Sequence, residues 1–289
     1  MQIKNAYVLC HFGSNIKYFE LELYFVLMLK ANTGPNIDII YLYSEIDTPI
    51  EWVKIMDKYF DKTIGYNDKF ILDAFEQSEF KSNYKHFNTL RTCAFLFAYE
   101  LINYNLICIV ESDMVLLNTL DPLFKMKYPA TLFINYGLSK NILNTNNLIK
   151  YKQNYKNCEK RSNINGGILL FKPNINKLNY AKKEILNVIQ NNCINPNEEL
   201  FLNIETKFNK TIYNIPIIYN YSHYELSKKL NTAPIRNLHF NETKFKYLDI
   251  IRSNYVNKFK EKIEIVNFFK SEYYDKYHDL IDSIMDLLK

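Results

Sequence analysis

Two carboxylates, Glu111 and Asp113, follow directly on the apolar run 106–110, with only Ser112 between them. An apolar run of this kind before charged residues predicts a short buried strand. Where a strand twists into a turn, acids at i and i+2 can both face one cation, and their hard oxygen ligands suit Mg²⁺ or Mn²⁺. Acids are also common at solvated strand ends, so the pattern alone leaves both interpretations open.

Three further places combine residue types and contexts that suit chemistry. His239 lies in the apolar segment 235–240, where a histidine is either a hydrogen-bonded core residue or a ligand. Glu198 follows the helix-start sequence Asn-Pro-Asn, where an acid commonly serves as a cap or faces the positive end of the helix dipole. Gly166 and Gly167 begin a predicted strand, where they either form a bulge or let the backbone approach a ligand closely.

The elements that must position these residues alternate between strand and helix. Strands are predicted at 6–10, 37–43, 106–110, 130–135, 166–171, 211–219 and 235–240. Helices are predicted from the turn at 13–15 to about residue 30 and over 48–60, 86–103, 176–190 and 198–205. This alternation predicts an α/β fold with a mainly parallel sheet, in which ligands bind beyond the carboxyl ends of the strands. The polar stretch 138–163 is expected to be a surface loop or a mobile helix, and the spacing after residue 254 is helical.

The composition restricts the classes of protein to which the chain can belong. The chain has 289 residues, 48% hydrophobic and 23% charged, which suits a domain with a full core. Its net charge of +5 is spread over 36 basic and 31 acidic residues, so we expect no nucleic-acid partner. Five scattered cysteines without a CxxC pair favour a reducing compartment. No apolar run is long enough to span a bilayer and no signal-peptide pattern is present, so we expect a soluble cytoplasmic protein.

The segment 106–124, LICIVESDMVLLNTLDPLF, resembles the metal-binding segment of the glycogenin-like retaining glycosyltransferases, glycosyltransferase family 8. In that family an apolar strand ends in Asp-x-Asp, followed by an apolar run, Asn-Ile-Asp and Leu-Phe. Four more matches follow the family's order: the opening strand 6–10, the Asn-Gly-Gly stretch 165–173, the helix start 197–203, and the landmarks at 218–220 and 238–240. The resemblance covers about residues 6 to 247.

This resemblance implies a GT-A (Rossmann-like) fold, with a mostly parallel central sheet flanked by helices. The GT-A domain would span 1–250 and a helical C-terminal extension 251–289. The resemblance also implies a metal set of Glu111, Asp113 and His239 that holds Mn²⁺ or Mg²⁺, with diphosphate oxygens in the open positions. The first acid is Glu111 where the family has Asp, and its longer side chain changes the coordination that can be expected.

The resemblance further implies how the sugar donor is bound and activated. Glu198 would lie beside the anomeric carbon, where it stabilises a cationic transition state or acts as the nucleophile. Glu199, which replaces a family Gln, would contact sugar hydroxyls. In the family's lysine loop the Gly is missing here, and two lysines straddle the expected position. The residues implied to bind the donor are Cys10, Phe12, Tyr18, Arg91, Ser112, Asn165, Gly166, Lys244 and Lys246.

From these residues we expect a metal-dependent retaining glycosyltransferase that transfers a hexose, glucose being favoured, from a UDP-sugar to a glycan or protein. A homodimer is compatible with the sequence. One alternative is a catalytically impaired nucleotide-sugar-binding or scaffold protein, which the altered metal acid and lysine loop favour. Another is a self-glucosylating enzyme, because Tyr221 and Tyr224 lie between the two last landmarks. A basic RNA- or DNA-binding protein is a third alternative, although no recognised module supports it.

Overall fold

The computed structural model describes residues 3–76, 91–116, 118–133, 142–144, 164–190, 195–222 and 236–239. The chain divides into two compact units, which are described in turn. The first consists of Met1–Ser14, Gly34–Glu111 and Asp121–Ile215, and the second of Asn15–Thr33, Ser112–Leu120 and Pro216–Lys289. The predicted extension 251–289 lies outside the described residues, so the predicted domain division stays a prediction.

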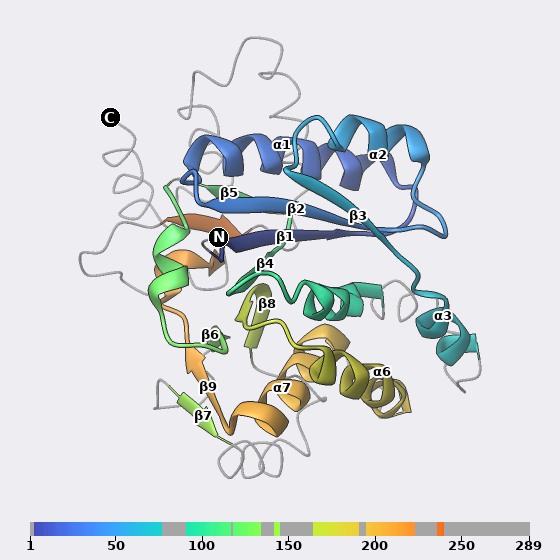
Figure 1. The fold of residues 1–289 in the computed structure, drawn as a ribbon, viewed down its shortest axis with the longest axis vertical. Coiled ribbons are helices and arrows are strands. Elements are labelled where there is room, and N and C mark those ends of the chain that lie inside the picture. The colour runs from blue at the N-terminus through green and yellow to red at the C-terminus, as the bar shows by residue number, and fades with distance from the viewer. Residues whose placement is uncertain are drawn as a thin grey trace, which may run out of the picture. The chain divides into compact units, whose positions relative to one another are not determined.

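The first unit is built on an eight-stranded sheet with the order β3-β2-β1-β4-β8-β6-β9-β7 (Figure 1). Its strands are β1 Asn5–His11, β2 Ile37–Ser44, β3 Lys62–Tyr66, β4 Ile107–Val110, β6 Ala130–Phe133, β7 Ile142–Asn144, β8 Ile164–Phe171 and β9 Thr211–Asn214. Strands β3, β2, β1 and β4 are parallel, whereas β8 runs antiparallel to both β4 and β6. The predicted α/β class is confirmed.

The inner parallel strands β1, β2 and β4 are largely buried apolar runs, as expected where both faces of a sheet are covered. All four residues of β4 are buried, and Val8 of β1 pairs with Ile109 of β4. Parallel pairing brings the carboxyl ends of β1, β2, β3 and β4 to one edge of the sheet. Polar residues that follow these strands in the sequence are therefore gathered at the edge where α/β folds bind ligands.

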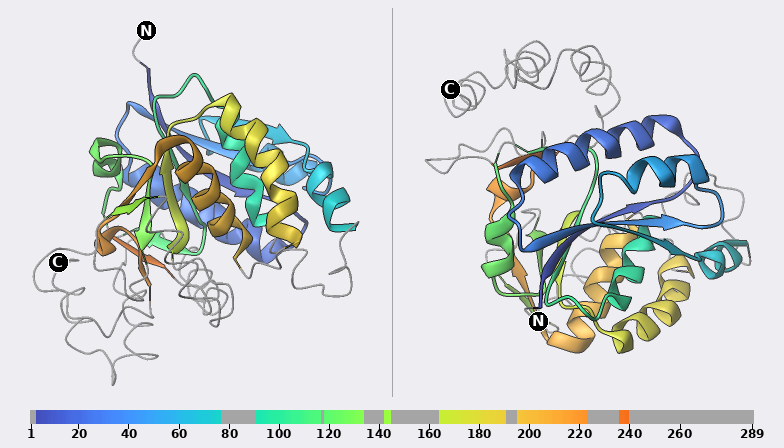
Figure 2. Two further views of the ribbon diagram at one scale, coloured as in Figure 1. Left: turned by 90° about the horizontal axis from the view of Figure 1, so that it is seen from below. Right: turned by 45° about the horizontal axis from the view of Figure 1, so that its top comes forward.

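Helices cover both faces of this parallel part. Figures 1 and 2 show α2 (Ile50–Met56) on one face, and the 3-10 helix η1 (Thr92–Glu100), α6 (Ile175–Gln190) and α7 (Pro196–Asn209) on the other. The helix α3 (Lys69–Glu76) follows β3, and a second 3-10 helix, η2, spans Asp121–Lys125. The core between the sheet and η1, α6 and α7 is aromatic: the ring centroids of Tyr99 and Phe171 are 4.4 Å apart, and those of Phe95 and Phe201 are 6.1 Å apart.

Three predicted elements differ from the structure. The described part of the predicted helix 86–103 is the 3-10 helix η1, in which residues 93–99 are all buried, so it has no polar face from which a helical period could be fixed. The predicted helix 48–60 ends at Met56 and continues as a turn. The predicted strand 211–219 ends at Asn214, because Pro216 has no amide proton for a ladder and instead precedes the 3-10 turn η3 (Ile217–Tyr219).

The described part of the second unit contains α1, the 3-10 turn η3 and a small sheet. Helix α1 (Ile16–Asn32) begins at Asn15, whose side chain accepts a hydrogen bond from the Lys17 amide. The sheet has the order β10-β11-β5, with β10 Tyr221–Ser222, β11 Asn237–His239 and β5 Met114–Leu116. The pairing of β11 with β5 is antiparallel and sets His239 opposite Met114.

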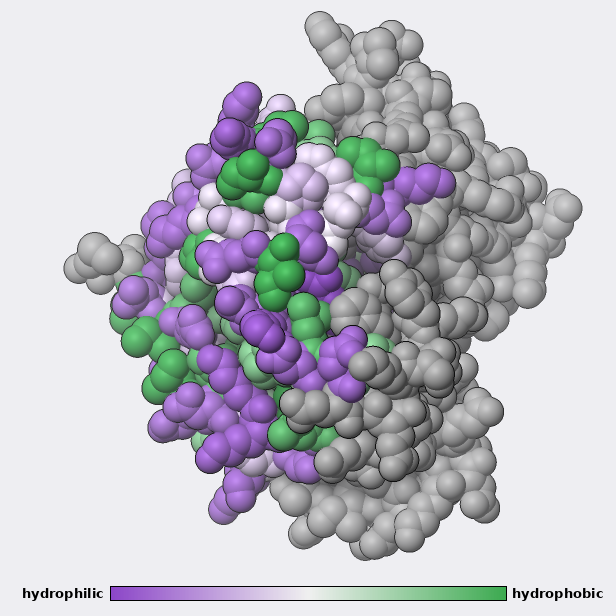
Figure 3. Space-filling model, turned by 90° about the vertical axis from the view of Figure 1, so that its right-hand side faces the viewer, coloured by the Kyte–Doolittle hydropathy of each residue, from purple (hydrophilic) through white to green (hydrophobic). Residues whose placement is uncertain are grey.

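Within the polar stretch 138–163, the three described residues form the strand β7 on β9 rather than a loop or helix. Among the described helices, none is both long and apolar enough to cross a membrane. On the face that Figure 3 shows, hydrophilic side chains predominate and apolar ones are scattered among them. This mixture is ordinary for a surface in contact with water.

Candidate functional site

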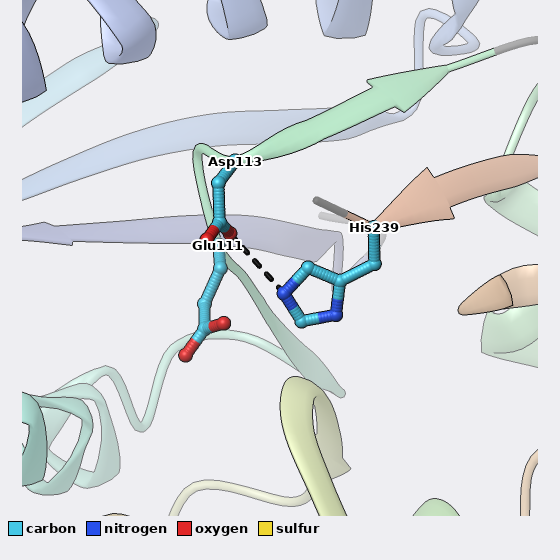
Figure 4. A group of neighbouring side chains, drawn as sticks. All are labelled: Glu111, Asp113 and His239. Atoms are coloured by element: carbon cyan, nitrogen blue, oxygen red, sulfur yellow. Dashed lines mark ion pairs between the residues drawn. The ribbon is translucent and has the colours of Figure 1, made fainter. Parts of the chain in front are cut away.

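The predicted metal residues come together where β4 ends. Glu111 follows β4, and Asp113 directly precedes β5. The β11–β5 pairing brings His239 beside Asp113, with 3.2 Å between Nε2 of the imidazole and Oδ1 of the carboxylate. Figure 4 shows the ring directed at the Asp113 carboxylate, with the Glu111 side chain beside it. Each of the three residues offers one ligand atom, and these atoms lie within 4.8 Å of one another.

The imidazole of His239 is oriented by a buried amide. Its Nδ1 lies 2.9 Å from Oδ1 of Asn220, which is fully buried. Because a carbonyl oxygen only accepts hydrogen bonds, Nδ1 carries the proton, and Nε2 is the nitrogen that faces Asp113. Two carboxylates and one imidazole nitrogen form a donor set that suits Mn²⁺ and, with less preference, Mg²⁺.

The predicted catalytic acid is held at the start of α7. Glu198 is 8% exposed, and its two carboxylate oxygens accept hydrogen bonds from the Gly166 amide at 3.0 Å and from the Asn195 side chain at 2.8 Å. A Cβ atom at position 166 would lie 2.8 Å from Nδ2 of Asn197 and 3.1 Å from Cγ of Glu198. A glycine is therefore what lets β8 approach the first turn of α7 this closely.

The predicted metal-binding acid Glu111 and the predicted catalytic acid Glu198 both hydrogen-bond to the backbone of β8. The amide of Glu111 donates to the Gly167 carbonyl at 3.2 Å, and the amide of Gly166 donates to Glu198. The side chain of Asn165 accepts from the Gly167 amide at 2.9 Å, which holds the backbone of β8 where its register with β6 shifts. Glu111 and Glu198, which are far apart in the sequence, thus hydrogen-bond to the backbone of two adjacent residues, Gly167 and Gly166.

Arg91, which the resemblance implies to bind the donor, is a buried residue. It is 3% exposed, and its Nε donates to Asp68 at 2.9 Å. Both terminal nitrogens of the guanidinium donate to the Asp47 carboxylate, Nη1 to Oδ2 at 2.5 Å and Nη2 to Oδ1 at 2.8 Å. Nη2 also donates to the Ser44 hydroxyl at 3.0 Å. Arg91 therefore joins the segments that follow β2 and β3.

The charges of this cluster stabilise one another. Burial alone would raise the pKa of Asp47, but the hydrogen bonds and the charge of Arg91 outweigh it and lower that pKa below its ordinary value. Burial would lower the pKa of Arg91, yet Asp47 and Asp68 together raise it. Sequence reasoning missed Ser44, Asp47 and Asp68. The available signal was their position, since each lies at or just after the carboxyl end of a strand.

The remaining predicted donor residues are placed as follows. Cys10 in β1 and Phe12 just after it are both half-buried. Tyr18 in the first turn of α1 is 38% exposed, and Ser112 is half-buried between the two metal acids. Glu199 is half-buried beside Glu198 at the start of α7. Lys244 and Lys246 lie outside the described residues.

Solved structures of glycosyltransferases resemble this chain. The structure of the galactosyltransferase LgtC in complex with donor and acceptor sugar analogues aligns with 81% of this chain and 86% of its own, at 12% identity and a TM-score of 0.55. An active-site mutant of LgtC aligns over the same shares at 13% identity and a TM-score of 0.53. Mouse xyloside xylosyltransferase 1 aligns with 84% of this chain and 99% of its own, at 9% identity and a TM-score of 0.49.

The two LgtC structures show the fold: this chain has the α/β fold of the GT-A glycosyltransferases, as expected. No protein-family model matches the sequence. A comparison with curated proteins finds no match either. The narrower resemblance to glycosyltransferase family 8 therefore remains a prediction from the sequence motifs.

Proposed function

We propose that this protein is a metal-dependent retaining glycosyltransferase that transfers a hexose from a UDP-sugar to a glycan or glycoprotein. The observation that carries the proposal is the group of Glu111, Asp113 and His239 at the carboxyl end of β4 in a GT-A fold. The likeness to LgtC, whose structure contains donor and acceptor sugar analogues, supports glycosyl transfer as the class of reaction.

The charge that develops on the leaving diphosphate is the main electrostatic demand of this reaction. A bound Mn²⁺ or Mg²⁺ would supply positive charge at those oxygens. The chain contributes the ligands, namely the two carboxylates and Nε2 of His239. Asn220 keeps the imidazole in the tautomer and orientation that ligation needs.

The negative charge of Glu198 is the chain's candidate for stabilising the reacting sugar. Its carboxylate accepts hydrogen bonds from the Gly166 amide and from the Asn195 side chain, which fix its position. A charge fixed in this way can stabilise an oxocarbenium-like transition state or attack the anomeric carbon, and either path retains the anomeric configuration. We assign Glu199 and Asn165 to the sugar hydroxyls, and Cys10, Phe12 and Tyr18 to the uracil.

A panel of UDP- and GDP-sugars, incubated with Mn²⁺ or with a chelator and analysed by mass spectrometry, tests this function. We expect UDP release from a UDP-hexose, with glucose favoured, and loss of that release when the metal is chelated. No turnover of any donor in the presence of Mn²⁺ would contradict the proposal.

A separate acceptor is favoured over self-modification, because an acceptor hydroxyl must reach a donor held by a rigid site. The intact mass of the protein after incubation with UDP-glucose and Mn²⁺ tests this preference. We expect no gain of hexose units. A gain that is lost in Tyr221→Phe or Tyr224→Phe would instead show self-glucosylation.

One observation favours a second candidate, a protein that binds nucleotide sugars without turning them over. Both carboxylate oxygens of Glu198 are engaged by neighbours in the protein, as they would be for a purely structural acid. Binding of UDP with Mn²⁺ in the absence of any hydrolysis or transfer would identify this alternative.

A further inference from the structure

The guanidinium of Arg91 and the carboxylate of Asp47 form a two-pronged ion pair, called here the Arg91–Asp47 clamp. The clamp lies where three parallel strands end. Ser44, the last residue of β2, accepts from Arg91, and Asp68, two residues after β3, accepts from it as well. The ring of Phe12, which follows β1, lies 5.0 Å below the guanidinium carbon.

The positive charge of Arg91 is already balanced by carboxylates of the protein, so the clamp is not suited to bind an anion. One guanidinium faces two carboxylates, and its Nε, Nη1 and Nη2 groups all donate within the protein. Arg91 is 3% exposed, whereas the Asp47 side chain is 37% exposed, so Asp47 is the partner of the pair that faces solvent. This arrangement favours a structural role for Arg91 over direct binding of a diphosphate.

The clamp also fixes the backbone that follows β1. The amide of Gly13 donates to Oδ1 of Asp47 at 3.0 Å. Gly13 has a φ of +86°, a conformation that side-chain-bearing residues disfavour, and the hydrogen bond to Asp47 holds it there. Asp47 thus acts on the segment 12–13 twice, directly through the Gly13 amide and indirectly through Arg91 and the cation–π contact with Phe12.

We propose that Asp47 is a positioning residue for the nucleoside of the donor. It holds Phe12 and Gly13 in place at the carboxyl end of β1, where the proposed function puts the planar base. The inference rests on the proposed function, since Phe12 is assigned to the uracil there. It differs from the sequence prediction, in which Arg91 binds the donor itself, because here the arginine supports Phe12 and Asp47 and does not contact the donor.

Asp47→Asn tests the positioning role, with Asp73→Asn as the control. Asn keeps the oxygen that accepts from Gly13 but turns an NH₂ group toward the Arg91 fork. Asp73 lies on α3 with a side chain 50% exposed, so its replacement makes the same change of charge away from the clamp. Titration calorimetry with UDP and Mn²⁺ should show affinity about five- to tenfold weaker in Asp47→Asn and unchanged in Asp73→Asn.

Two further readouts separate positioning from general damage. In UDP-hexose hydrolysis, Asp47→Asn should raise KM for the donor while kcat stays near that of the parent, because a ground-state contact is loosened. Hydrogen exchange of the Gly13 amide should accelerate in Asp47→Ala and not in Asp73→Asn, and this measurement needs no ligand. The melting temperature and near-UV circular dichroism identify a variant that has lost its fold.

Several outcomes would overturn the inference. Unchanged UDP affinity in Asp47→Asn, with normal binding by the parent, overturns it and leaves the proposed function standing. Tighter UDP binding in Asp47→Asn also overturns it, because Asp47 would then occupy the place of a donor phosphate. If the parent itself binds no UDP with Mn²⁺, the proposed function fails together with the positioning role.

Discussion

The chemistry of the candidate metal site depends on how one imidazole is held. His239 is 4% exposed and Asp113 is 7% exposed, so a charge on either side chain is poorly solvated unless a partner or a cation balances it. Asn220 fixes which nitrogen of the ring carries the proton. The ability of Nε2 to bind a cation is therefore a property of the Asn220–His239 pair and not of the histidine alone.

Replacing Asn220 should weaken metal binding without removing a ligand. In Asn220→Ala the ring loses the acceptor for Nδ1, and we expect affinity for Mn²⁺ to fall roughly 10- to 100-fold. In Asn220→Asp the acceptor is kept and made negative, so affinity should be retained or raised. Electron paramagnetic resonance of free Mn²⁺ measures both. Equal affinity in the parent and Asn220→Ala would show that Asn220 does not orient the ligand.

Glu198→Gln separates donor binding from chemistry. The side chain keeps its size, and Asn195 can rotate its amide so that an oxygen faces the new NH₂ group. We expect nearly normal UDP affinity and a loss of donor turnover of roughly 10²-fold or more, because the charge facing a cationic transition state is gone. Glu51→Gln, on the exposed side of α2, is the control. Unchanged turnover in Glu198→Gln would make Glu198 a structural residue of the helix start.

At the scale of elements, α6, α7 and η1 are tied together by one buried carboxylate. Glu205 of α7 accepts from Nζ of Lys177 in α6 at 2.7 and 2.9 Å and from the Tyr99 hydroxyl of η1 at 2.6 Å. Asn209, at the end of α7, donates to the same carboxylate. Burial raises the pKa of Glu205, although Lys177 opposes this shift. Because Glu198 lies in the first turn of α7, these contacts also fix the helix that presents the candidate catalytic acid.

Lys177→Met should destabilise the fold by about 3 to 5 kcal/mol at neutral pH, because it leaves Glu205 buried without its cation. In this variant the folded-state pKa of Glu205 stays above the unfolded value of 4.5, so protonation favours folding and the loss should shrink as the pH falls toward 4.5. Urea unfolding of both proteins at the two pH values measures the difference. Lys177→Met combined with Glu205→Leu should recover much of the stability. A loss that is equal at both pH values would contradict the ion-pair explanation.

Most of the elements could be predicted because buried strands leave an apolar run in the sequence and amphipathic helices leave a helical spacing of apolar residues. Strands β1, β2, β4, β6, β8 and β11 and helices α1, α6 and α7 lie where the sequence predicts them. Strand β3 and helix α3 were not predicted. Only Tyr66 of β3 is buried, so this edge strand leaves no apolar run. The 3-10 helix η1 was taken for an α-helix because its residues are buried on every side.

The candidate site was predictable only in part, for a related reason. Glu111 and Asp113 follow the apolar run of β4, and Glu198 lies in the first turn of a helix whose start can be recognised in the sequence. His239 was assigned to the same site only through the resemblance of the motif at 238–240. The partners of Arg91 carry no such signal. Ser44, Asp47 and Asp68 become its neighbours only through the parallel pairing of β1, β2 and β3, which joins segments far apart in the sequence. Local patterns do not report contacts of this kind.

At the scale of the whole molecule, the GT-A fold and the group of Glu111, Asp113 and His239 support different conclusions. The fold is shared with glycosyltransferases of 12–13% identity, and a fold alone does not determine an activity. The net charge of +5 favours encounter with an anionic nucleotide sugar but does not select one. The activity therefore depends on whether Glu111, Asp113 and His239 bind a cation that the donor needs.

The most direct test is the rate of UDP release from UDP-glucose and related UDP-hexoses by the parent and by Asp113→Asn, with Mn²⁺ and with a chelator. The replacement keeps the size of the side chain and removes the charge that would hold the cation. We predict turnover by the parent that requires Mn²⁺, and no Mn²⁺-dependent turnover in Asp113→Asn while its circular dichroism spectrum matches that of the parent. Full activity of Asp113→Asn at ordinary Mn²⁺ concentrations, or turnover by the parent that a chelator leaves intact, would contradict the proposed metal site.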